Sequence, residues 1–178
     1  GAMSDTQLER VSAAIDSLLA EYPPATTEDR EFRGRRYDAG LAWVHFPEGF
    51  GGLGVRPDLN RLVEERCRKA GAKATDASTF FMALAGPTIV THGSDEQKQR
   101  FLRPMFTGEE KWCQLFSEPG AGSDFAGLST RAVRDGDEYV VNGHKWYTTN
   151  ATHPRCEVFI FMGKSDPGNP DRHRQQSM

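Results

Sequence analysis

The sequence predicts an α+β protein in which helices come first and strands come second. Up to about Lys111, apolar residues recur every three or four positions, the period of a helix that buries one face. Beyond Lys111 the pattern changes to short alternating runs separated by glycine-containing turns. Because the two patterns are segregated along the chain, we expect an all-α helical domain at 1–111 and a partial antiparallel β-domain at 112–178.

Two helices are expected before the first glycine-rich loop. Leu8–Leu19 has the apolar spacing of the first helix, and the prolines at 23–24 end it. Either Thr26 or Thr27 can cap the second helix, which we expect to run as far as Leu41.

Three more helices complete the first domain. We expect one at Asp58–Ala70, with the aspartate as its cap, and another at about 75–91. Ser94 and Gln97 have the spacing of a capping box, which predicts a last helix that ends near Phe106.

Glycine marks the expected loops. Four of the nine residues at 46–54 (FPEGFGGLG) are glycine, which permits the positive φ of a tight turn or the close approach of a ligand. The stretch 163–178, rich in glycine, proline and charge, is also expected to be a loop.

The second domain contains several short strand patterns. Cys113–Ser117 is expected to be extended, and Leu128–Arg134 and Tyr139–Val141 are expected to pair across a turn at Asp135-Gly136. Val158–Met162 is a continuous apolar run, which predicts a buried strand.

Composition excludes several classes of function. The 178 residues carry a formal net charge of −3, with 26% charged and 37% hydrophobic residues. A globular chain this close to neutral lacks the basic field of a nucleic-acid binder, so no nucleic-acid partner is expected. No apolar run is long enough for a membrane span, and the first residues do not have the pattern of a secretory signal, so we expect a cytoplasmic protein.

The three cysteines predict no metal site. They form no CxxC pair, and the five histidines are too scattered to complete a zinc set with them. We expect reduced cysteines that act as small buried apolar residues.

The most informative stretch is SEPGAGSD at 117–124. Pro119 restricts the backbone while Gly120 and Gly122 free it, so successive N–H groups can point at one anion or carbonyl. Phe125 stands where a GxGxxG motif needs its third glycine, and neither a GxxxxGK[ST] nor a GxSxG motif occurs. A plain hairpin loop is the alternative interpretation.

A second stretch, NGHKWYTTN at 142–150, places two large aromatic residues beside two hydroxyls. Such a set can stack on a flat ring and hydrogen-bond its edge. The alternative is a β-strand whose aromatic residues belong to the core.

SEPGAGSD at 117–124 and NGHKWYTTNA at 142–151 closely resemble the acyl-CoA dehydrogenase family. FPEGFGGLG at 46–54 and GSDEQKQRFL at 93–102 resemble the helical-domain signatures of the same family, and the four motifs occur in the family's order. The resemblance implies an N-terminal helical domain and the first part of a middle β-domain, without the C-terminal four-helix domain of the family.

The resemblance also implies a reaction and its partners. Family members oxidise an acyl-CoA thioester to the 2-enoyl-CoA, pass a hydride to FAD, and deliver the electrons to an electron-transfer flavoprotein. They work as homo-oligomers. This chain would be a fragment of such an enzyme that is inactive by itself, because the catalytic base of most members belongs to the C-terminal domain.

The family's cofactor-binding positions fall in the two motifs. The residues that would contact FAD are Gln114, Leu115, Phe116, Ser117, Gly122, Ser123, Tyr147, Thr148 and Thr149. Ser117 would bind the polar edge of the flavin ring, and Ser123 would also contact the substrate. Tyr147 would stack near the ring, and the Thr149 hydroxyl would lie near its N5 atom.

Some positions depart from the family pattern. Tyr147 stands where many members have tryptophan, and Gln114 replaces a more usual aromatic or apolar residue. No catalytic residue is assigned, and we interpret Glu118 as a structural carboxylate.

Two other functions remain open at this stage. The chain could be a non-catalytic subunit or interaction module of a heteromeric dehydrogenase, since it lacks the base. It could also belong to a flavin oxidase or monooxygenase of the same fold, because one fold hosts several chemistries.

Overall fold

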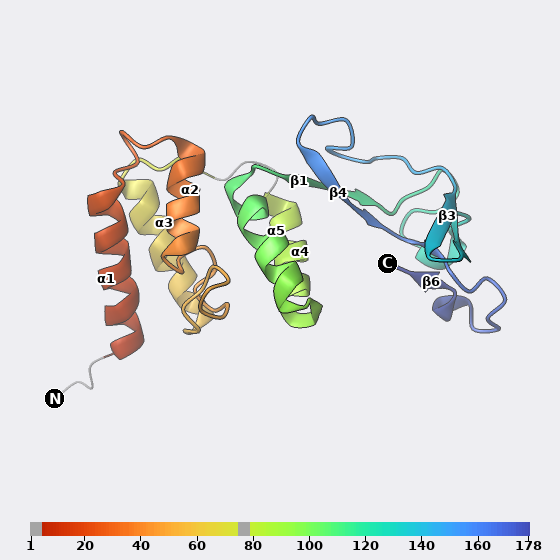
Figure 1. Cartoon of the computed structure of the whole chain (residues 1–178), viewed down its shortest axis with the longest axis horizontal. Helices are drawn as coiled ribbons and strands as arrows, with labels where there is room; N and C mark the ends of the chain where they lie inside the picture. The colour runs from red at the N-terminus through yellow and green to blue at the C-terminus, as the bar shows by residue number, and fades with distance from the viewer. Residues whose placement is uncertain (1–4, 75–78) are drawn as a thin grey trace. The chain divides into compact units, whose positions relative to one another are not determined.

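The computed structural model describes residues 5–74 and 79–178 and divides the chain into two compact units, Gly1–Glu110 and Lys111–Met178 (Figure 1). The described α-helices all lie in the first unit, and the described strands lie in the second. The predicted α+β class is therefore confirmed.

The first helix, α1 (Thr6–Glu21), follows the predicted apolar spacing. The Asp5 carboxylate caps it by accepting a hydrogen bond from the Leu8 N–H at 3.2 Å. Val11 and Ile15 lie one turn apart on its inner face and are fully buried. The helix ends just before the prolines at 23–24, as the sequence predicts.

The second helix, α2 (Asp29–Asp38), begins later and ends earlier than expected. Its cap is Glu28, whose carboxylate accepts from two backbone N–H groups. The prediction of Thr26 or Thr27 was wrong, because both residues lie in a turn that closes on the Pro23 carbonyl and the helix begins only after that turn. Leu41 lies beyond the helix and is buried.

The third helix, α3 (Asn60–Lys69), follows a short 3₁₀ turn at Pro57–Leu59. Asp58 was expected to cap it, but this residue lies inside the 3₁₀ turn and pairs with Arg56 at 3.1 Å. Pro57 begins this 3₁₀ turn, three residues before the helix, because its fixed φ suits the first position of a helical segment.

Two more helices complete the unit, α4 (Thr79–His92) and α5 (Asp95–Thr107). The predicted start of α4 near residue 75 lies outside the described residues. The capping box of α5 is present, with Ser94 and Gln97 each accepting a bond from the other's backbone N–H. The prediction of this helix is confirmed.

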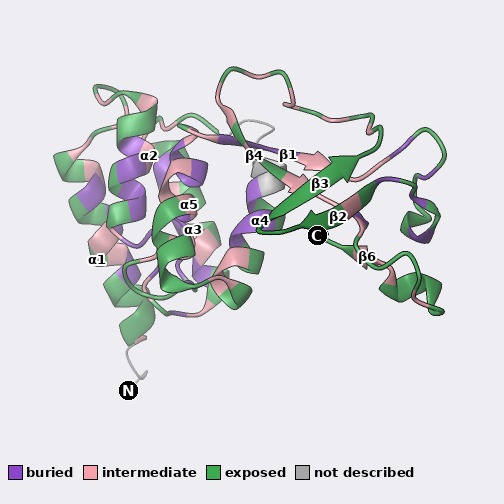
Figure 2. Cartoon of the chain, turned by 45° about the vertical axis from the view of Figure 1, so that its right-hand side comes forward, coloured by how far each residue is buried: buried purple, intermediate pink, exposed green. Residues whose placement is uncertain are grey.

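The core of the helical unit lies between α1, α2, α3 and the loop that follows α2. Figure 2 shows buried residues along the facing sides of these helices. Burial of this apolar surface is the main stabilising contribution in this unit. The buried members are Val11, Ile15, Leu18, Phe32, Leu41, Val44, Val55, Leu59, Val63 and Cys67.

The glycine-rich loop at 46–54 uses glycine for two different reasons. Gly49, Gly51 and Gly54 have φ between +64° and +87°, which confirms the predicted positive φ at these positions. Gly52 instead makes a close backbone approach, since a Cβ there would lie 2.0 Å from the Phe46 carbonyl oxygen.

In the second unit, strand β1 (Lys111–Leu115) pairs in parallel with β4 (Cys156–Phe161). The strand predicted at Val158–Met162 is therefore present, but it is not buried as expected. Its residues are partly or fully exposed, with Phe159 at 48%. The apolar run predicted a buried strand, whereas β4 has only β1 as a neighbour among the described strands.

The other described sheet has the strand order β3-β2-β5-β6. The predicted hairpin is formed by β2 (Arg131–Asp135) and β3 (Glu138–Asn142), which pair antiparallel across a turn with Gly136 at φ +62°. The stretch expected to be a loop supplies β5 (Gly163–Lys164) and β6 (Gln176–Ser177).

The β-domain was expected to be antiparallel, and this holds for the β2–β3 and β5–β6 pairs only. The β1–β4 and β2–β5 pairs are parallel, and the sheets are mixed. Turn signals predict only the local antiparallel hairpin, because a parallel pair needs a long connection that has no short sequence signature. Figure 2 shows that β2 and β3 are exposed along most of their length.

None of the described helices is both long and apolar enough to cross a membrane.

We expect Gly52→Ala to destabilise the helical unit by about 1–3 kcal/mol, because the added methyl group meets backbone that cannot rotate away. Thermal unfolding followed by circular dichroism measures the loss. Gly86→Ala is the matched control: Gly86 lies inside α4, its Cβ would lie at least 3.4 Å from other atoms, and alanine favours a helix by roughly 0.5–1 kcal/mol. Equal stability of the two variants contradicts the prediction.

Candidate functional site

The first motif begins where β1 ends. Phe116 and Ser117 continue from the strand and are half-buried. The chain then reverses between Glu118 and Ala121, whose backbones exchange two hydrogen bonds of 2.8 and 3.1 Å. This turn leaves the following residues, Gly122 and Ser123, exposed at the surface of the unit.

The second motif follows β3 and forms no strand between residues 143 and 148. The interpretation of this stretch as a core β-strand was therefore wrong. Trp146 is 39% exposed and Tyr147 is 81% exposed, so their rings are presented to the surroundings rather than buried.

The structure brings the two motifs side by side. The Trp146 N–H donates to the Ser117 carbonyl at 3.0 Å. The Lys145 ammonium donates to the Phe116 carbonyl at 2.8 Å. The two motifs are therefore joined directly by hydrogen bonds, although Phe116 and Lys145 are 29 positions apart in the sequence.

The Glu118 carboxylate organises the base of this arrangement. It is 3% exposed, and both of its oxygens accept hydrogen bonds. Ser129 donates from its N–H and its hydroxyl, at 2.7 and 2.9 Å. The Thr130 N–H donates at 3.0 Å and the Lys145 ammonium at 2.9 Å.

Burial by itself raises the pKa of Glu118, but the hydrogen bonds from Thr130, Ser129 and Lys145 outweigh it and lower the pKa to about 2. Glu118 is therefore an ionised acceptor at neutral pH with no oxygen left for proton transfer. This favours a structural role for the carboxylate.

Sequence reasoning missed Lys145 and Gly143. The Lys145 side chain is only 9% exposed and pairs with the buried Glu118. Gly143 lies against Thr130, since a Cβ there would come within 2.0 Å of the Thr130 hydroxyl oxygen. No local signal links these residues to Glu118, because they meet only through the fold.

Tyr147 has an unusual backbone. Its φ is +54°, a left-handed conformation that costs free energy for a bulky side chain. Nearby, Asn150 has φ +74° and donates from its side-chain amide to the Trp112 carbonyl at 3.4 Å, which ties the stretch to β1. The Trp146 and Tyr147 ring centres lie 4.9 Å apart. A strained, exposed aromatic pair is typical of a binding site.

Several hydroxyls of the two motifs are free to bind a ligand. Within residues 5–74 and 79–178, the structure shows no hydrogen-bond partner for the side chains of Ser117, Ser123, Thr148 and Thr149. Hydroxyls both donate and accept, so together with the exposed rings they suit a planar group with a polar edge. Gln114, Leu115 and Phe116 are half-buried along β1 and its continuation.

Among the described residues, no group of three or more histidine, cysteine or acidic side chains could hold a metal ion.

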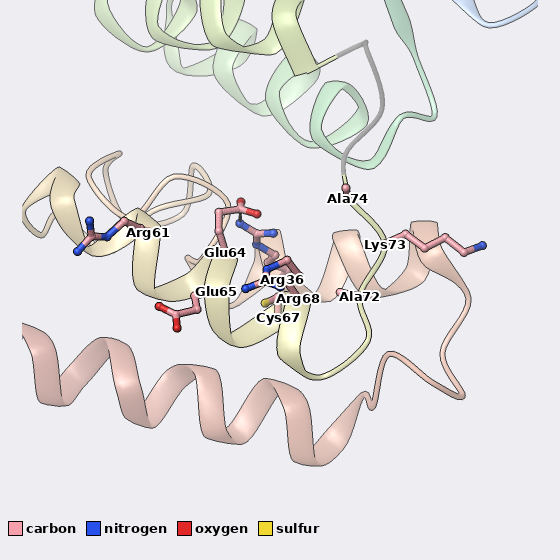
Figure 3. Close-up of a pocket in the computed structure, with 9 residues that line it drawn as sticks. All are labelled: Arg36, Arg61, Glu64, Glu65, Cys67, Arg68, Ala72, Lys73 and Ala74. Atoms are coloured by element: carbon pink, nitrogen blue, oxygen red, sulfur yellow. Dashed lines mark hydrogen bonds and ion pairs between the residues drawn. The ribbon is translucent and has the colours of Figure 1, made fainter.

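A separate hollow of about 370 Å³ lies in the helical unit, and it contains none of the predicted site residues. Figure 3 shows Arg36, Glu64, Cys67 and Arg68 gathered at its centre. Arg36 forms an ion pair with Glu64 and also donates to the Leu41 carbonyl. The lining of this hollow is highly charged, which does not suit a largely apolar planar ring.

Comparison with known proteins agrees with the two motifs. The family model "Acyl-CoA dehydrogenase, N-terminal domain" matches residues 3–109, and "Acyl-CoA dehydrogenase, middle domain" matches residues 113–178.

Individual relatives give the same result. Acyl-CoA dehydrogenase FadE34 of Mycobacterium tuberculosis is 39% identical over 88% of this chain and 21% of its own length. Caffeyl-CoA reductase-Etf complex subunit CarC of Acetobacterium woodii is 32% identical over 71% of this chain and 33% of its own. The crystal structure of acyl-CoA dehydrogenase from Geobacillus kaustophilus matches with a TM-score of 0.61 and 30% identity, over 99% of this chain and 47% of that one. The chain spans less than half the length of each.

The low pKa of Glu118 predicts acid sensitivity of the β-containing unit. Because folding lowers this pKa from 4.5 to about 2, the associated stability is fully present above about pH 5 and is lost as the pH falls through 4.5 towards 2. The loss is on the order of 3 kcal/mol. Urea unfolding at a series of pH values measures it.

Glu118→Gln should flatten this part of the pH profile, since glutamine has no charge to lose. Glu157→Gln, at an exposed position of β4, is the control and should leave the profile unchanged. A Glu118→Gln variant with the same acid dependence as the original chain contradicts the assignment.

Proposed function

The chain belongs to the acyl-CoA dehydrogenase family, and we propose that it forms the helical part and the flavin-binding part of an FAD-dependent acyl-CoA dehydrogenase. The proposed reaction is the α,β-dehydrogenation of an acyl-CoA thioester to the 2-enoyl-CoA. One observation carries the proposal: Ser117 and Trp146 are hydrogen-bonded, so two motifs distant in sequence present free hydroxyls and exposed rings together.

The residues present fit a flavin ring. FAD, when bound, supplies the acceptor for the hydride that leaves the β-carbon of the substrate. The backbone of 114–117 and the Ser117 hydroxyl bind the polar edge of the ring, while Tyr147 offers its exposed face for stacking. The Thr148 and Thr149 hydroxyls would complete the second wall, and we propose that Thr149 would donate near N5. Fixed donors of this kind favour the reduced, anionic ring.

The turn at Glu118–Ala121 leads into the residues proposed to contact the substrate. Gly122 and Ser123 are exposed immediately after the turn, where the acyl-CoA would meet the ring. Ser123 is the residue proposed to contact both FAD and substrate. None of the 178 residues is proposed as the catalytic base.

The proposed partners follow from the family. The electrons pass to an electron-transfer flavoprotein, in line with the name of CarC as a subunit of a complex with Etf. We also propose that the gene product carrying this sequence is a homo-oligomer. The alternative is a heteromeric dehydrogenase in which this chain contributes one flavin wall. The subunit composition of the purified enzyme distinguishes this alternative from a homo-oligomer.

The proposal is tested on the gene product that carries these 178 residues. We expect the purified protein to show flavin absorbance, and this absorbance to bleach without oxygen when a suitable acyl-CoA is added. A protein that neither retains nor binds FAD refutes the proposal. Oxygen consumption during turnover indicates an oxidase instead of a dehydrogenase.

In that protein, Thr149→Val should slow flavin reduction by roughly 10²-fold, the usual effect of removing one preorganised donor to a developing negative charge. Valine has nearly the shape of threonine, so the fold should be unchanged. Stopped-flow absorbance measures the rate. Thr152→Val, at an exposed turn position, is the matched control. Equal reduction rates in the two variants contradict the role of Thr149.

A further inference from the structure

The Lys145 side chain connects three parts of the β-containing unit. Its ammonium donates to the Phe116 carbonyl at 2.8 Å and to Glu118 at 2.9 Å. It also lies 5.7 Å from the centre of the Phe161 ring, at the end of β4. At 9% side-chain exposure, the ammonium has exchanged most of its water for these partners.

Glu118 holds the ammonium in one place. Apart from Lys145, the carboxylate accepts three hydrogen bonds from Ser129 and Thr130, which lead into β2. Its low pKa keeps it charged throughout the physiological range. A carboxylate bound on several sides cannot rotate to follow its partner, so the position of Glu118 decides the position of the ammonium.

The ammonium belongs to the residue just before the exposed rings. Trp146 follows Lys145 directly and donates its N–H to Ser117, and Tyr147 then takes its strained φ of +54°. The side chain of Lys145 and the backbone of Trp146 therefore attach the second motif to the start of the first, at Ser117 and at Phe116 directly before it.

We propose that Lys145 is a positioning residue for the cofactor: through Glu118 and the Phe116 carbonyl, it sets where the wall at 146–149 lies relative to Ser117. This inference rests on the proposed flavin site. It differs from a purely stabilising ion pair, because the geometry at the ring, and not only the stability of the unit, depends on the length and shape of this side chain.

The test uses the gene product that carries this sequence and compares Lys145→Met with Lys164→Met. Lys164 lies in β5 and forms no ion pair with any described residue, so its removal is the matched control. We expect Lys145→Met to weaken FAD binding by about tenfold or more, as expected for a disrupted buried polar network, and to shift the visible absorbance and circular dichroism of the bound flavin. Lys164→Met should leave both unchanged.

The Lys145→Arg variant keeps the positive charge and changes only the shape of the side chain, so it tests positioning apart from charge. It also provides the test if Lys145→Met does not fold. Arginine keeps a cation for Glu118, but its planar, longer head cannot occupy the place of the ammonium. We expect a melting temperature near that of the original protein, together with a shifted flavin spectrum and several-fold weaker FAD binding. Amide exchange at Trp146 should also quicken, because its bond to Ser117 loosens.

The outcomes are distinct. A folded Lys145→Arg or Lys145→Met variant with unchanged flavin spectrum, FAD affinity and Trp146 exchange overturns the positioning role and leaves the flavin site intact. An original protein that binds no FAD refutes the proposed function itself, and the role of Lys145 toward a flavin falls with it.

Discussion

The β-containing unit depends on one buried carboxylate, that of Glu118. Removing a charge from water is costly, and an unpaired carboxylate at this depth would destabilise the fold. Four donors offset the cost: two from Ser129, one from Thr130 and one from Lys145. Because these donors come from segments far apart in the chain, satisfying Glu118 also brings together the turn after β1, the start of β2 and the stretch after β3.

The candidate site is the exposed side of the same arrangement. Tyr147 keeps an unfavourable backbone conformation while its ring is 81% exposed, so packing of the ring inside this unit does not account for the strain. The bonds of its neighbours to Ser117 and Trp112 hold the stretch in place. A bound planar ring would cover the exposed aromatic surface and use the free hydroxyls. The site formed by the two motifs therefore suits a flavin better than the charged hollow between α2 and α3.

The elements that could be predicted are those with local causes. The capping box of Ser94 and Gln97, the stop before the prolines at 23–24 and the hairpin at Gly136 each depend on residues within a few positions of one another. The errors occurred where local candidates competed. At the start of α2 the cap is Glu28, since Thr26 and Thr27 both lie in the turn that precedes the helix. The burial of β4 was also wrongly predicted, because the exposure of a strand depends on which neighbours it has in the fold.

The sequence by itself determined the residue types and order of the two motifs, and from them the family and the chemistry to expect. Only the tertiary structure decided that Lys145 is buried against Glu118, that Gly143 packs on Thr130, and that β1 pairs in parallel with β4. The reason is physical. Turn and cap preferences act over a few residues, whereas an ion pair across 27 positions requires closure of the chain between its partners and burial of both charges.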